Sequence, residues 1–461
     1  MAQNMCGCNS VVECQPSKLF VAGSIPVTRS KDKMKKKILV IGVGSGGILT
    51  IGQMLAGLDS SWDVHSVHDP KIPILGVGEA TSTNTPYQLF KGTDFVLFRD
   101  GHHLSATLKH SVKYTNWRPE PFDSLIMPPG YALHFDNTKL KDFAFMRFEQ
   151  NFPTRFTKIE GRVEYFKNIE NAVEVKINDT VYNYDYVIDC SGFPKDFTDY
   201  EMVDLPINHA LVTAIEKPGD WNYTHHWAHP NGWMFGIPLQ HRQGWGYMYN
   251  DTITSLEEAK ADMCSILKVN PEEQKFREYT FKPYFTSNSL INGRIMKNGN
   301  QYLFFEPMEA LSMEYYTTLN TRYLAWLNGK LDKEKLLDIA DLDARSLVRF
   351  YRFIYHGGST YDTPFWKMAK ESSIRGLAED RHWQGIQDFW NESRNKPHAS
   401  SDITLQPFPA WVWLAFCKNL GYDYFELPKD LPPNTTGDYQ TYPEHRRPKP
   451  SSKLEKIVWK F

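Results

Sequence analysis

The order of apolar and polar residues predicts that the fold begins near residue 35. The segment KKKILVIGVGSGG, residues 35–47, places a continuous apolar run before a glycine-rich turn. Such a run, bounded by a turn, is typical of a strand buried in a parallel sheet. The apolar stretch ILTIGQML then predicts a helix that begins near Gly46. A second strand is expected in WDVHSVHDP, residues 62–70, and another buried strand in DYVIDCSGF, residues 185–193.

Alternation of side chains characterises ATLKHSVKYTNW, residues 106–117. Successive side chains of a strand point to opposite faces, so Lys109 and Lys113 are expected on one polar face of a single half-buried strand. Most lysines in such positions face water. The local pattern therefore gives neither lysine a special role.

Helical spacing dominates the last third of the chain. The segment TTLNTRYLAWLNGK, residues 317–330, places its apolar residues on one helical face and ends at a glycine suited to a C-cap. The same spacing returns in Leu347, Phe350, Tyr351 and Ile354. Proline and charge in PKDLPPNTT and PEHRRPKPSS then predict a loop-rich tail.

Composition narrows the classes of partner. The chain has 461 residues with 52 basic and 54 acidic side chains, and its formal net charge is -2. This balance argues against nucleic acid and against an anionic membrane surface as partners. No apolar stretch of about 20 residues predicts a membrane span. Aromatic residues make up 14% of the chain, which suits an aromatic-lined cavity and a well-packed core equally.

The cysteines indicate a reducing compartment. Six cysteines in 461 residues are too few for a disulfide framework. Cys6, Cys8 and Cys14 cluster, but no nearby histidine or cysteine completes a zinc ligand set, so we expect no metal site. Residues 1–34 lack an apolar core long enough for a signal peptide. We expect them to be a flexible leader of a cytoplasmic protein.

Gly42, Gly44 and Gly47 have the spacing of the dinucleotide-binding fingerprint. The first glycine permits a tight turn, the second lets the backbone approach a pyrophosphate, and the third lets the helix pack on the strand. The pyrophosphate would lie at the helix N-terminus. The second strand should end in a group that binds the adenosine ribose. His68 is at that position, but we expect Asp69, because a carboxylate accepts two hydroxyl donors. A solvated Asp69 that opens a turn is the alternative.

Several short segments together resemble one family, the flavin-dependent halogenases of the tryptophan halogenase type, and leave open whether this is a viral member. They occur in the family's order over about residues 35–370: GVGSGG, GVGEAT, ATLKHSVKYTNW, HFDNTKL, IDCSGF, GWMFGIPL, FEPMEALS and YDTPFW. The glycine turn of IDCSGF lies far from the fingerprint, as in two-segment flavoprotein modules.

The resemblance implies an α/β fold with an FAD-binding, Rossmann-type module like that of flavoprotein monooxygenases. Residues 35–335 would form this module with interleaved substrate-site segments. Residues 336–461 would form a mainly helical C-terminal region and the loop-rich tail. The location would be the host cytoplasm if the source is viral, and a homo-oligomer is left open.

The resemblance also implies an activity. FAD reduced by a separate reductase reacts with O2 and oxidises halide to hypohalous acid, which reaches a lysine that would be Lys109. As an ammonium, this lysine could donate a hydrogen bond to the oxidant; as a neutral amine it could form a haloamine. The partner carboxylate would be Glu309, which could accept the proton that leaves the ring. A charge satisfied at a strand-to-helix turn is the structural alternative for Glu309.

Further site residues follow from the same resemblance. Ala80 and Leu211 would contact the flavin, and the amides of Leu311 and Ser312 would bind halide. Ala310 and Leu311 replace the family's Ser-Thr pair, which leads us to expect a preference for bromide or iodide over chloride. The residues that separate flavin from substrate would be Trp233, Phe235 and Pro238, with Phe235 in place of a second tryptophan.

The substrate is expected to be a small aromatic molecule. We expect an open site for varied indoles or phenols, with Phe122 and either Trp411 or Trp413 stacking on the ring, although core packing is the more common role of such residues. A flavin-dependent aromatic hydroxylase, which would need no pair of Lys109 and Glu309, is the second candidate. A non-catalytic flavoprotein is the third, and a dehydrogenase the fourth.

Overall fold

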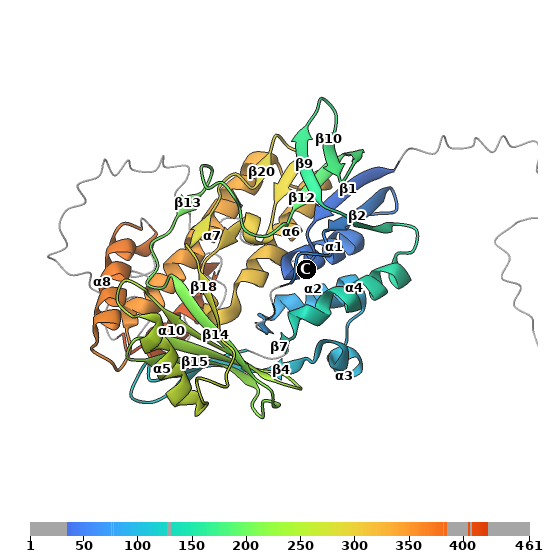
Figure 1. The fold of residues 1–461 in the computed structure, drawn as a ribbon. Coiled ribbons are helices and arrows are strands. Elements are labelled where there is room, and N and C mark those ends of the chain that lie inside the picture. The colour runs from blue at the N-terminus through green and yellow to red at the C-terminus, as the bar shows by residue number, and fades with distance from the viewer. Residues whose placement is uncertain are drawn as a thin grey trace, which may run out of the picture. The chain divides into compact units, whose positions relative to one another are not determined.

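The computed structural model describes residues 35–74, 76, 78–126, 131–380, 382–384, 404–405 and 408–422. The leader expected at residues 1–34 and the loop-rich tail expected near the C-terminus lie outside these residues. The described residues from Lys36 onward belong to one compact unit, which holds all the elements given below (Figure 1).

A six-stranded sheet forms the framework of the N-terminal part. Its strands, in spatial order, are β20 (Leu290–Ile291), β21 (Ile295–Lys297), β12 (Tyr186–Asp189), β1 (Lys36–Ile41), β2 (Trp62–His68) and β8 (Phe156–Glu160). All neighbours are parallel except β20. The helix α1 (Ser45–Gly57) connects β1 to β2. These elements confirm the strands and the helix start that the apolar pattern predicts.

The two faces of this sheet are covered by different layers. Leu39 and Ile41 of β1 pack with Val175 against a small antiparallel sheet. This sheet consists of β11 (Thr180–Tyr184), β10 (Val173–Ile177) and β9 (Val163–Asn168). Ile38 and Val40 point to the other face and join the main core. That face carries α1, α2 (Asn84–Thr93) and α4 (Asn137–Asn151), as Figure 1 shows.

A seven-stranded sheet forms the second framework. Its strands, in spatial order, are β18 (Arg277–Thr280), β14 (His209–Ile215), β17 (Gln243–Tyr249), β16 (Gly232–Pro238), β15 (Tyr223–His229), β5 (Ser111–Thr115) and β6 (Phe122–Leu125). Only the pair β5 and β15 is parallel. Met234 and Tyr247 pack in a cluster of their own with Met263 of α5 (Leu256–Leu267), whereas Trp233 and Phe235 belong to the main core. We call the side that carries Trp233 and Phe235 the inner face.

The segment expected to form one strand at residues 106–117 is in fact two strands in different sheets. The strand β4 (Thr107–Lys109) pairs with β7 (Ala132–Phe135), which also pairs with β3 (Glu79–Ala80). His110 separates β4 from β5, and its amide donates to the carbonyl of Asn222. The expectation of a single alternating strand is therefore wrong at His110, because the chain changes sheets there and the alternation loses its phase.

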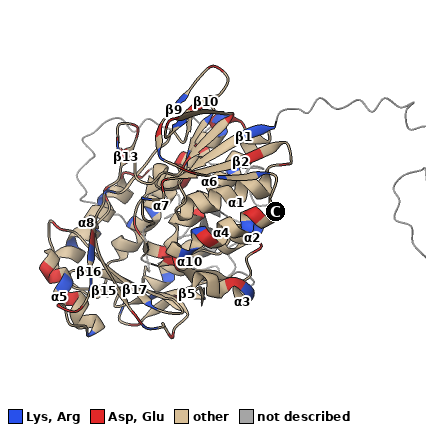
Figure 2. Ribbon diagram, turned by 45° about the vertical axis from the view of Figure 1, so that its right-hand side comes forward, with Lys and Arg blue, Asp and Glu red and all other residues tan. Residues whose placement is uncertain are grey.

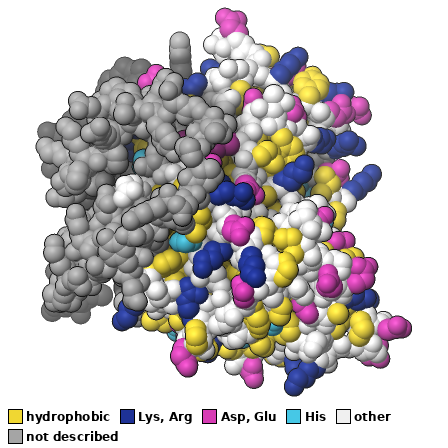
Figure 3. Space-filling view, turned by 90° about the vertical axis from the view of Figure 1, so that its left-hand side faces the viewer, with side chains coloured by type: hydrophobic (Ala, Val, Ile, Leu, Met, Phe, Trp, Pro, Cys, Tyr) yellow, Lys and Arg dark blue, Asp and Glu magenta, His cyan; other side chains and the backbone are white. Residues whose placement is uncertain are grey.

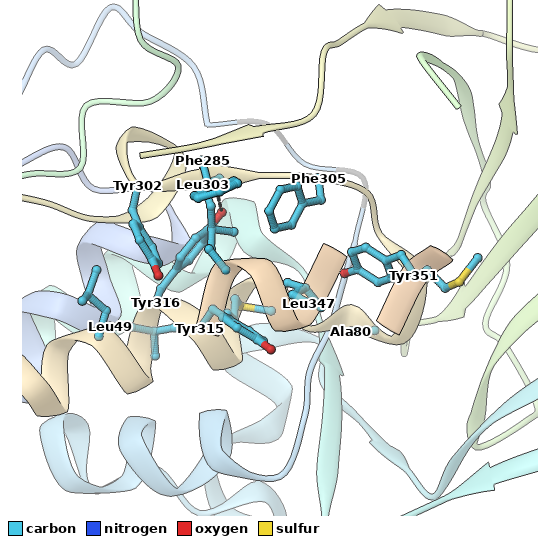
Figure 4. Packing of buried hydrophobic residues seen from close by; sticks show 14 of the residues in the cluster. Leu49, Ala80, Phe285, Tyr302, Leu303, Phe305, Tyr315, Tyr316, Leu347 and Tyr351 are labelled. Atoms are coloured by element: carbon cyan, nitrogen blue, oxygen red, sulfur yellow. Dashed lines mark hydrogen bonds between the residues drawn. The ribbon is translucent and has the colours of Figure 1, made fainter. Parts of the chain in front are cut away.

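Helices form most of the described C-terminal part. They are α6 (Ser312–Leu327), α7 (Lys333–Gly357), α8 (Pro364–Ala378) and α10 (Ala410–Asn419). Leu319 and Tyr323 are buried on the predicted face of α6. Figure 4 shows Tyr302, Leu303 and Phe305 beside Tyr315 and Tyr316 of this helix. The domain boundary expected after residue 335 falls inside α7.

Short elements complete the unit. They are α3 (Leu97–Asp100), η1 (Gly101–Leu104), η2 (Gly299–Gln301), η3 (Met308–Ala310), β13 (Glu201–Met202), β19 (Tyr284–Phe285), β22 (Leu303–Phe304), β23 (Thr404–Leu405) and β24 (Phe408–Pro409). Within the described ranges, each helix is too short or too polar to span a membrane. Basic and acidic side chains are interspersed along the ribbon in Figure 2 and over the described surface in Figure 3.

Candidate active site

The glycine fingerprint turns between β1 and the start of α1. Gly42 has a φ of +96°, and a Cβ on it would lie 2.3 Å from the carbonyl oxygen of Cys190. A Cβ on Gly47 would lie 2.1 Å from the carbonyl oxygen of Gly42. A Cβ on Gly44 would meet nothing within 4 Å. The first and third glycines are thus required by the protein itself, whereas open space at the second fits the approach of a pyrophosphate to the N-terminus of α1.

Gly299 joins this turn from far along the chain, which sequence reasoning missed. A Cβ on Gly46 would lie 3.0 Å from the Cα of Gly299, which itself has a φ of +59°. The buried side chain of Asn298 accepts from the Gly299 amide at 2.8 Å and donates to Asn320 at 2.6 Å. The segment KNG directly after the apolar residues of β21 was the available signal, because it repeats the pattern of a strand followed by a glycine turn.

The end of β2 favours the turn alternative for Asp69. The Asp69 carboxylate accepts from the amide of Lys71 at 2.9 Å. The ring of His68 lies 5.8 Å from that of Phe145, and its Nδ1 is buried without a hydrogen-bond partner. Both rings line a surface pocket of about 240 Å³, together with Lys158. The Asp69 carboxylate thus caps a turn, whereas His68 lines a pocket.

Lys109 is buried, with 2% of its surface exposed. Its Nζ donates to the carbonyl oxygen of Thr81 at 2.9 Å, and Thr81 belongs to the GVGEAT segment. Burial lowers the pKa of Lys109 to about 8, although the charge of Glu309 opposes this shift. Lys113 is only partly buried, and its ammonium lies 5.1 Å from the centre of the Tyr223 ring. The two lysines thus have different surroundings.

Glu309 lies in a strained turn and is held by two hydroxyl groups. Its φ is +58°, and that of Ala310 is +57°, so two consecutive residues with side chains adopt the left-handed conformation. The Glu309 carboxylate accepts from Tyr114 Oη at 2.7 Å and from Ser124 Oγ at 3.1 Å. Burial raises the pKa of Glu309, and the charge of Lys109 partly reverses this. Lys109 and Glu309 therefore interact electrostatically, but they form no ion pair within 4.0 Å in the described structure.

The residues expected at the halide follow this turn directly. Leu311 is the N-cap of α6, and Ser312 is its first residue. Amide groups in the first turn of a helix have no partner within the helix, and the helix dipole makes that end positive. The side chain of Leu311 packs against the main core. The backbone here can accept an anion regardless of which side chains replace the family's Ser-Thr pair.

The residues expected to separate flavin from substrate lie along β16. Trp233 is 0% exposed, and Phe235 is 6% exposed. The Trp233 indole donates to Tyr355 Oη at 2.8 Å, and that hydroxyl donates to Glu306 Oε2 at 2.8 Å. Burial raises the pKa of Glu306 to about 8, and hydrogen bonding from Tyr355 opposes this. Glu306, a buried acid that sequence reasoning missed, is thus connected to Trp233 through the Tyr355 hydroxyl. Its position in the FEPMEALS segment was the available signal.

Pro238 and the predicted flavin contacts Ala80 and Leu211 lie in different parts of the fold. Pro238 ends β16, and its carbonyl oxygen accepts from Thr107 at 2.7 Å. Ala80 lies in β3 within the main core. The side chain of Leu211 instead packs in the cluster that contains Met263 of α5. Because that cluster lies on the side opposite the inner face, we leave Leu211 out of the proposed flavin site.

The residues predicted to stack on the substrate ring have different surroundings. The Phe122 ring is half-buried and stacks on that of Tyr114, with centroids 4.7 Å apart and an interplanar angle of 4°. Trp413 is 1% exposed and contacts Phe350 of α7, so it is a core residue. The side chain of Trp411 lies outside the described parts of the chain. Of the two candidates whose side chains are described, only Phe122 thus lies next to Tyr114, which donates to Glu309.

Comparison with known proteins identifies the family of this chain. The family model described as tryptophan halogenase matches residues 37–127 and 119–396. The chain belongs to the tryptophan halogenase family. The tryptophan 7-halogenase RebH of Lentzea aerocolonigenes is 23% identical over 434 residues, which cover 73% of this chain and 79% of the relative. The tryptophan 6-halogenase ThaL of Streptomyces albogriseolus is 22% identical over 447 residues, which cover 76% and 82%.

Solved structures share the fold of this halogenase. Xcc4156, a flavin-dependent halogenase from Xanthomonas campestris, has a TM-score of 0.71 at 18% identity, covering 84% of this chain and 89% of its own. A tryptophan halogenase from Shewanella frigidimarina has a TM-score of 0.69 at 16% identity, covering 93% of both chains. These findings confirm the predicted α/β flavoprotein fold. The protein is a flavin-dependent halogenase, so FAD is its implied cofactor.

Proposed function

We propose that this enzyme halogenates a small aromatic molecule of the indole or phenol type, with Lys109 and Glu309 at the reacting end of the site. The observation that supports this most is the burial of Lys109 together with its charge interaction with Glu309, whose carboxylate two hydroxyl groups orient. A buried amine with a lowered pKa and a coupled carboxylate is typical of a functional site. The curated relatives are named for tryptophan, which makes indoles the first substrates to test.

The residues around the fingerprint fit FAD. Gly42, Gly44 and Gly47 would hold its pyrophosphate at the start of α1, with Gly299 beside them, and His68 would lie at the adenosine end. When bound in reduced form, FAD supplies with O2 the oxidising power that converts halide into hypohalous acid. A separate reductase would deliver the reduced FAD. The chain's own residues bind, orient and shield these reactants.

The halide would lie on the amides of Leu311 and Ser312. Ala310 and Leu311 make this turn less polar than a Ser-Thr pair, and a less polar site favours anions that lose their water easily. Bromide and iodide are larger and more easily desolvated than chloride. We therefore expect bromide or iodide to outcompete chloride when all three are supplied together and the products are separated by mass spectrometry. Preferential incorporation of chloride would contradict this expectation.

Lys109 would hold the oxidant at the substrate ring. In its ammonium form, Nζ can donate to the oxygen of hypohalous acid and make the halogen more electrophilic. As the oxygen–halogen bond breaks, the ring carbon gains the halogen, and the oxygen takes a proton from the Lys109 ammonium and leaves as water. The ring carbon then loses its own proton to Glu309, and return of a proton from Glu309 to Lys109 restores both groups. Burial makes the Glu309 carboxylate a stronger base than one in water, so it is suited to accept the ring proton. Tyr114 and Ser124 would keep this carboxylate in one orientation.

Trp233, Phe235 and Pro238 would separate the flavin from the substrate. A wall at this point prevents direct transfer of oxygen to the ring, which is the reaction of an aromatic hydroxylase. The Phe235 ring fills the space beside Gly246, where a Cβ would lie 2.2 Å from it. The wall therefore needs no second tryptophan.

One reconstituted assay tests the proposal. It contains the purified protein, FAD, an independent flavin reductase, NADH and one halide, with a panel of indoles and phenols, and is read by mass spectrometry. Halogenated products are expected from the wild type and are expected to vanish in Lys109→Ala. Lys113→Ala is the matched control, because this lysine is close in sequence but lies at the Tyr223 ring. Oxygen insertion without halide would support the hydroxylase instead, and bound flavin without any product would support a non-catalytic flavoprotein.

A further inference from the structure

His226 lies in β15 on the inner face of the seven-stranded sheet. It pairs with Tyr114 of β5 and with Phe235 of β16. Directly paired residues of neighbouring strands point to the same side of a sheet. The His226 ring lies 5.1 Å from the Tyr114 ring and 4.9 Å from the Trp233 ring, measured between centroids. The imidazole is thus between the residue that orients Glu309 and the proposed wall.

Both ring nitrogens of His226 are buried and have no hydrogen-bond partner. His226 is 0% exposed. His134 provides a contrast, because it is equally buried but its ring nitrogens contact Thr107 at 3.2 Å and Thr224 at 2.9 Å. Buried polar groups in folded proteins are nearly always paired. Among the buried histidines that the structure describes, His226 alone leaves both ring nitrogens unpaired, so its ring can still donate one hydrogen bond and accept another.

The surroundings of His226 decide which form of the ring is present. Burial holds the pKa of His226 well below its ordinary value, and the nearby charge of Lys109 lowers it further. The ring is therefore neutral near pH 7. A neutral imidazole offers one N–H donor and one acceptor nitrogen. It suits an uncharged N–H or O–H group better than a carboxylate or an ammonium.

We propose that His226 binds the substrate of this halogenase by accepting a hydrogen bond from a free N–H or O–H group on the aromatic ring of the substrate. The proposal rests on the proposed function and names the substrate class more closely. Indoles with an unsubstituted nitrogen and phenols with a free hydroxyl meet the requirement, whereas N-alkylated indoles and aryl ethers do not. His226 is a substrate-binding residue here and has no part in forming the oxidant.

The test compares substrates that differ only in this donor. The pairs are indole with 1-methylindole and phenol with anisole, assayed with bromide in the wild type and in His226→Phe. For the wild type we expect kcat/KM to be about tenfold higher for the donor-bearing member of a pair, the effect of one lost hydrogen bond. In His226→Phe the two members should be equal within about twofold. His225→Phe is the matched control and should keep the wild-type ratio, because its side chain points to the opposite face and contacts Trp221 and Trp245.

Further measurements separate the modes of failure. FAD binding and halide oxidation in the absence of substrate should be unchanged in His226→Phe. An unchanged substrate ratio in this variant, or equal wild-type rates within both pairs, would overturn the inference while the proposed function stands. Absence of brominated product from all four compounds with the wild type would overturn the proposed function. If His226→Phe fails to melt cooperatively, the same ratio measured in the smaller His226→Leu decides the question.

Discussion

At the scale of single residues, Lys109 and Glu309 illustrate how burial shifts the pKa values of two interacting groups. Both charged forms are disfavoured by desolvation, and each is partly restored by the other. Glu309 also lies in a left-handed backbone conformation, which is unfavourable for a residue with a side chain and concentrates at functional sites. The resemblance indicated both residues. Their partners Thr81, Tyr114 and Ser124 could not be predicted, because they come from distant segments.

A pH prediction follows from the pKa of Lys109, which is about 8. The amine is protonated below that pH and neutral above it. If the ammonium holds the oxidant, the halogenation rate at saturating substrate should fall as the pH rises through about 8. The measurement is the pH profile of product formation, with halide oxidation followed in parallel to correct for oxidant supply. A rate that rises through the same range would instead indicate the neutral amine and a haloamine.

At the scale of elements, the apolar pattern predicted β1, α1, β2, β12 and α6 well. A continuous apolar run or a 3.6-residue spacing identifies β1, α1, β12 and α6 from local sequence alone. The pattern failed where the chain changes sheets at His110. It also gave no order for the seven strands of the second sheet, because pairing between distant strands leaves no mark in local periodicity.

The element formed by β1, the glycine turn and α1 allows a test that separates folding from cofactor binding. Gly44→Ala adds a Cβ where there is open space, so it should leave the flavin-free protein nearly as stable as the wild type while weakening FAD binding at least tenfold. Gly47→Ala forces a Cβ against the Gly42 carbonyl and should destabilise the protein by about 1–3 kcal/mol. Thermal melting and flavin titration measure the two effects. Equal FAD affinity in Gly44→Ala and the wild type would contradict the proposed pyrophosphate site.

At the scale of the whole unit, the C-terminal helices belong to the same core as the flavin-binding part. Leu347 and Tyr351 of α7 share one buried cluster with Ile38 of β1. The Tyr355 hydroxyl of the same helix connects Trp233 to Glu306. Residue 335, where a division is expected, lies inside α7, and one core contains residues from both sides of it.

Arg118 offers a test of this continuity. Its guanidinium donates to the carbonyl oxygens of Gly357 at 2.8 Å and Leu420 at 2.7 Å, which joins the end of β5 to α7 and to the end of α10. Arg118→Gln should lower the free energy of unfolding by about 2–4 kcal/mol, because it removes charge-assisted hydrogen bonds to partly buried carbonyl groups. Urea denaturation measures this loss, and the exposed Arg277→Gln is the control. An unchanged midpoint would show that these contacts contribute little.

The sequence by itself determined the α/β class and the glycine turn, and through family resemblance it singled out Lys109 and Glu309 as candidates. It could do so because those signals lie within short segments. Tertiary structure decided that Lys109 turns inward while Lys113 does not, that Asp69 closes a turn while His68 lines a pocket, and that His226 lacks a partner. Each of these depends on which distant segment packs opposite a residue. Local spacing assigns a side chain to one face of a strand or helix, but only the assembled sheets and helices determine which residues pack against that face.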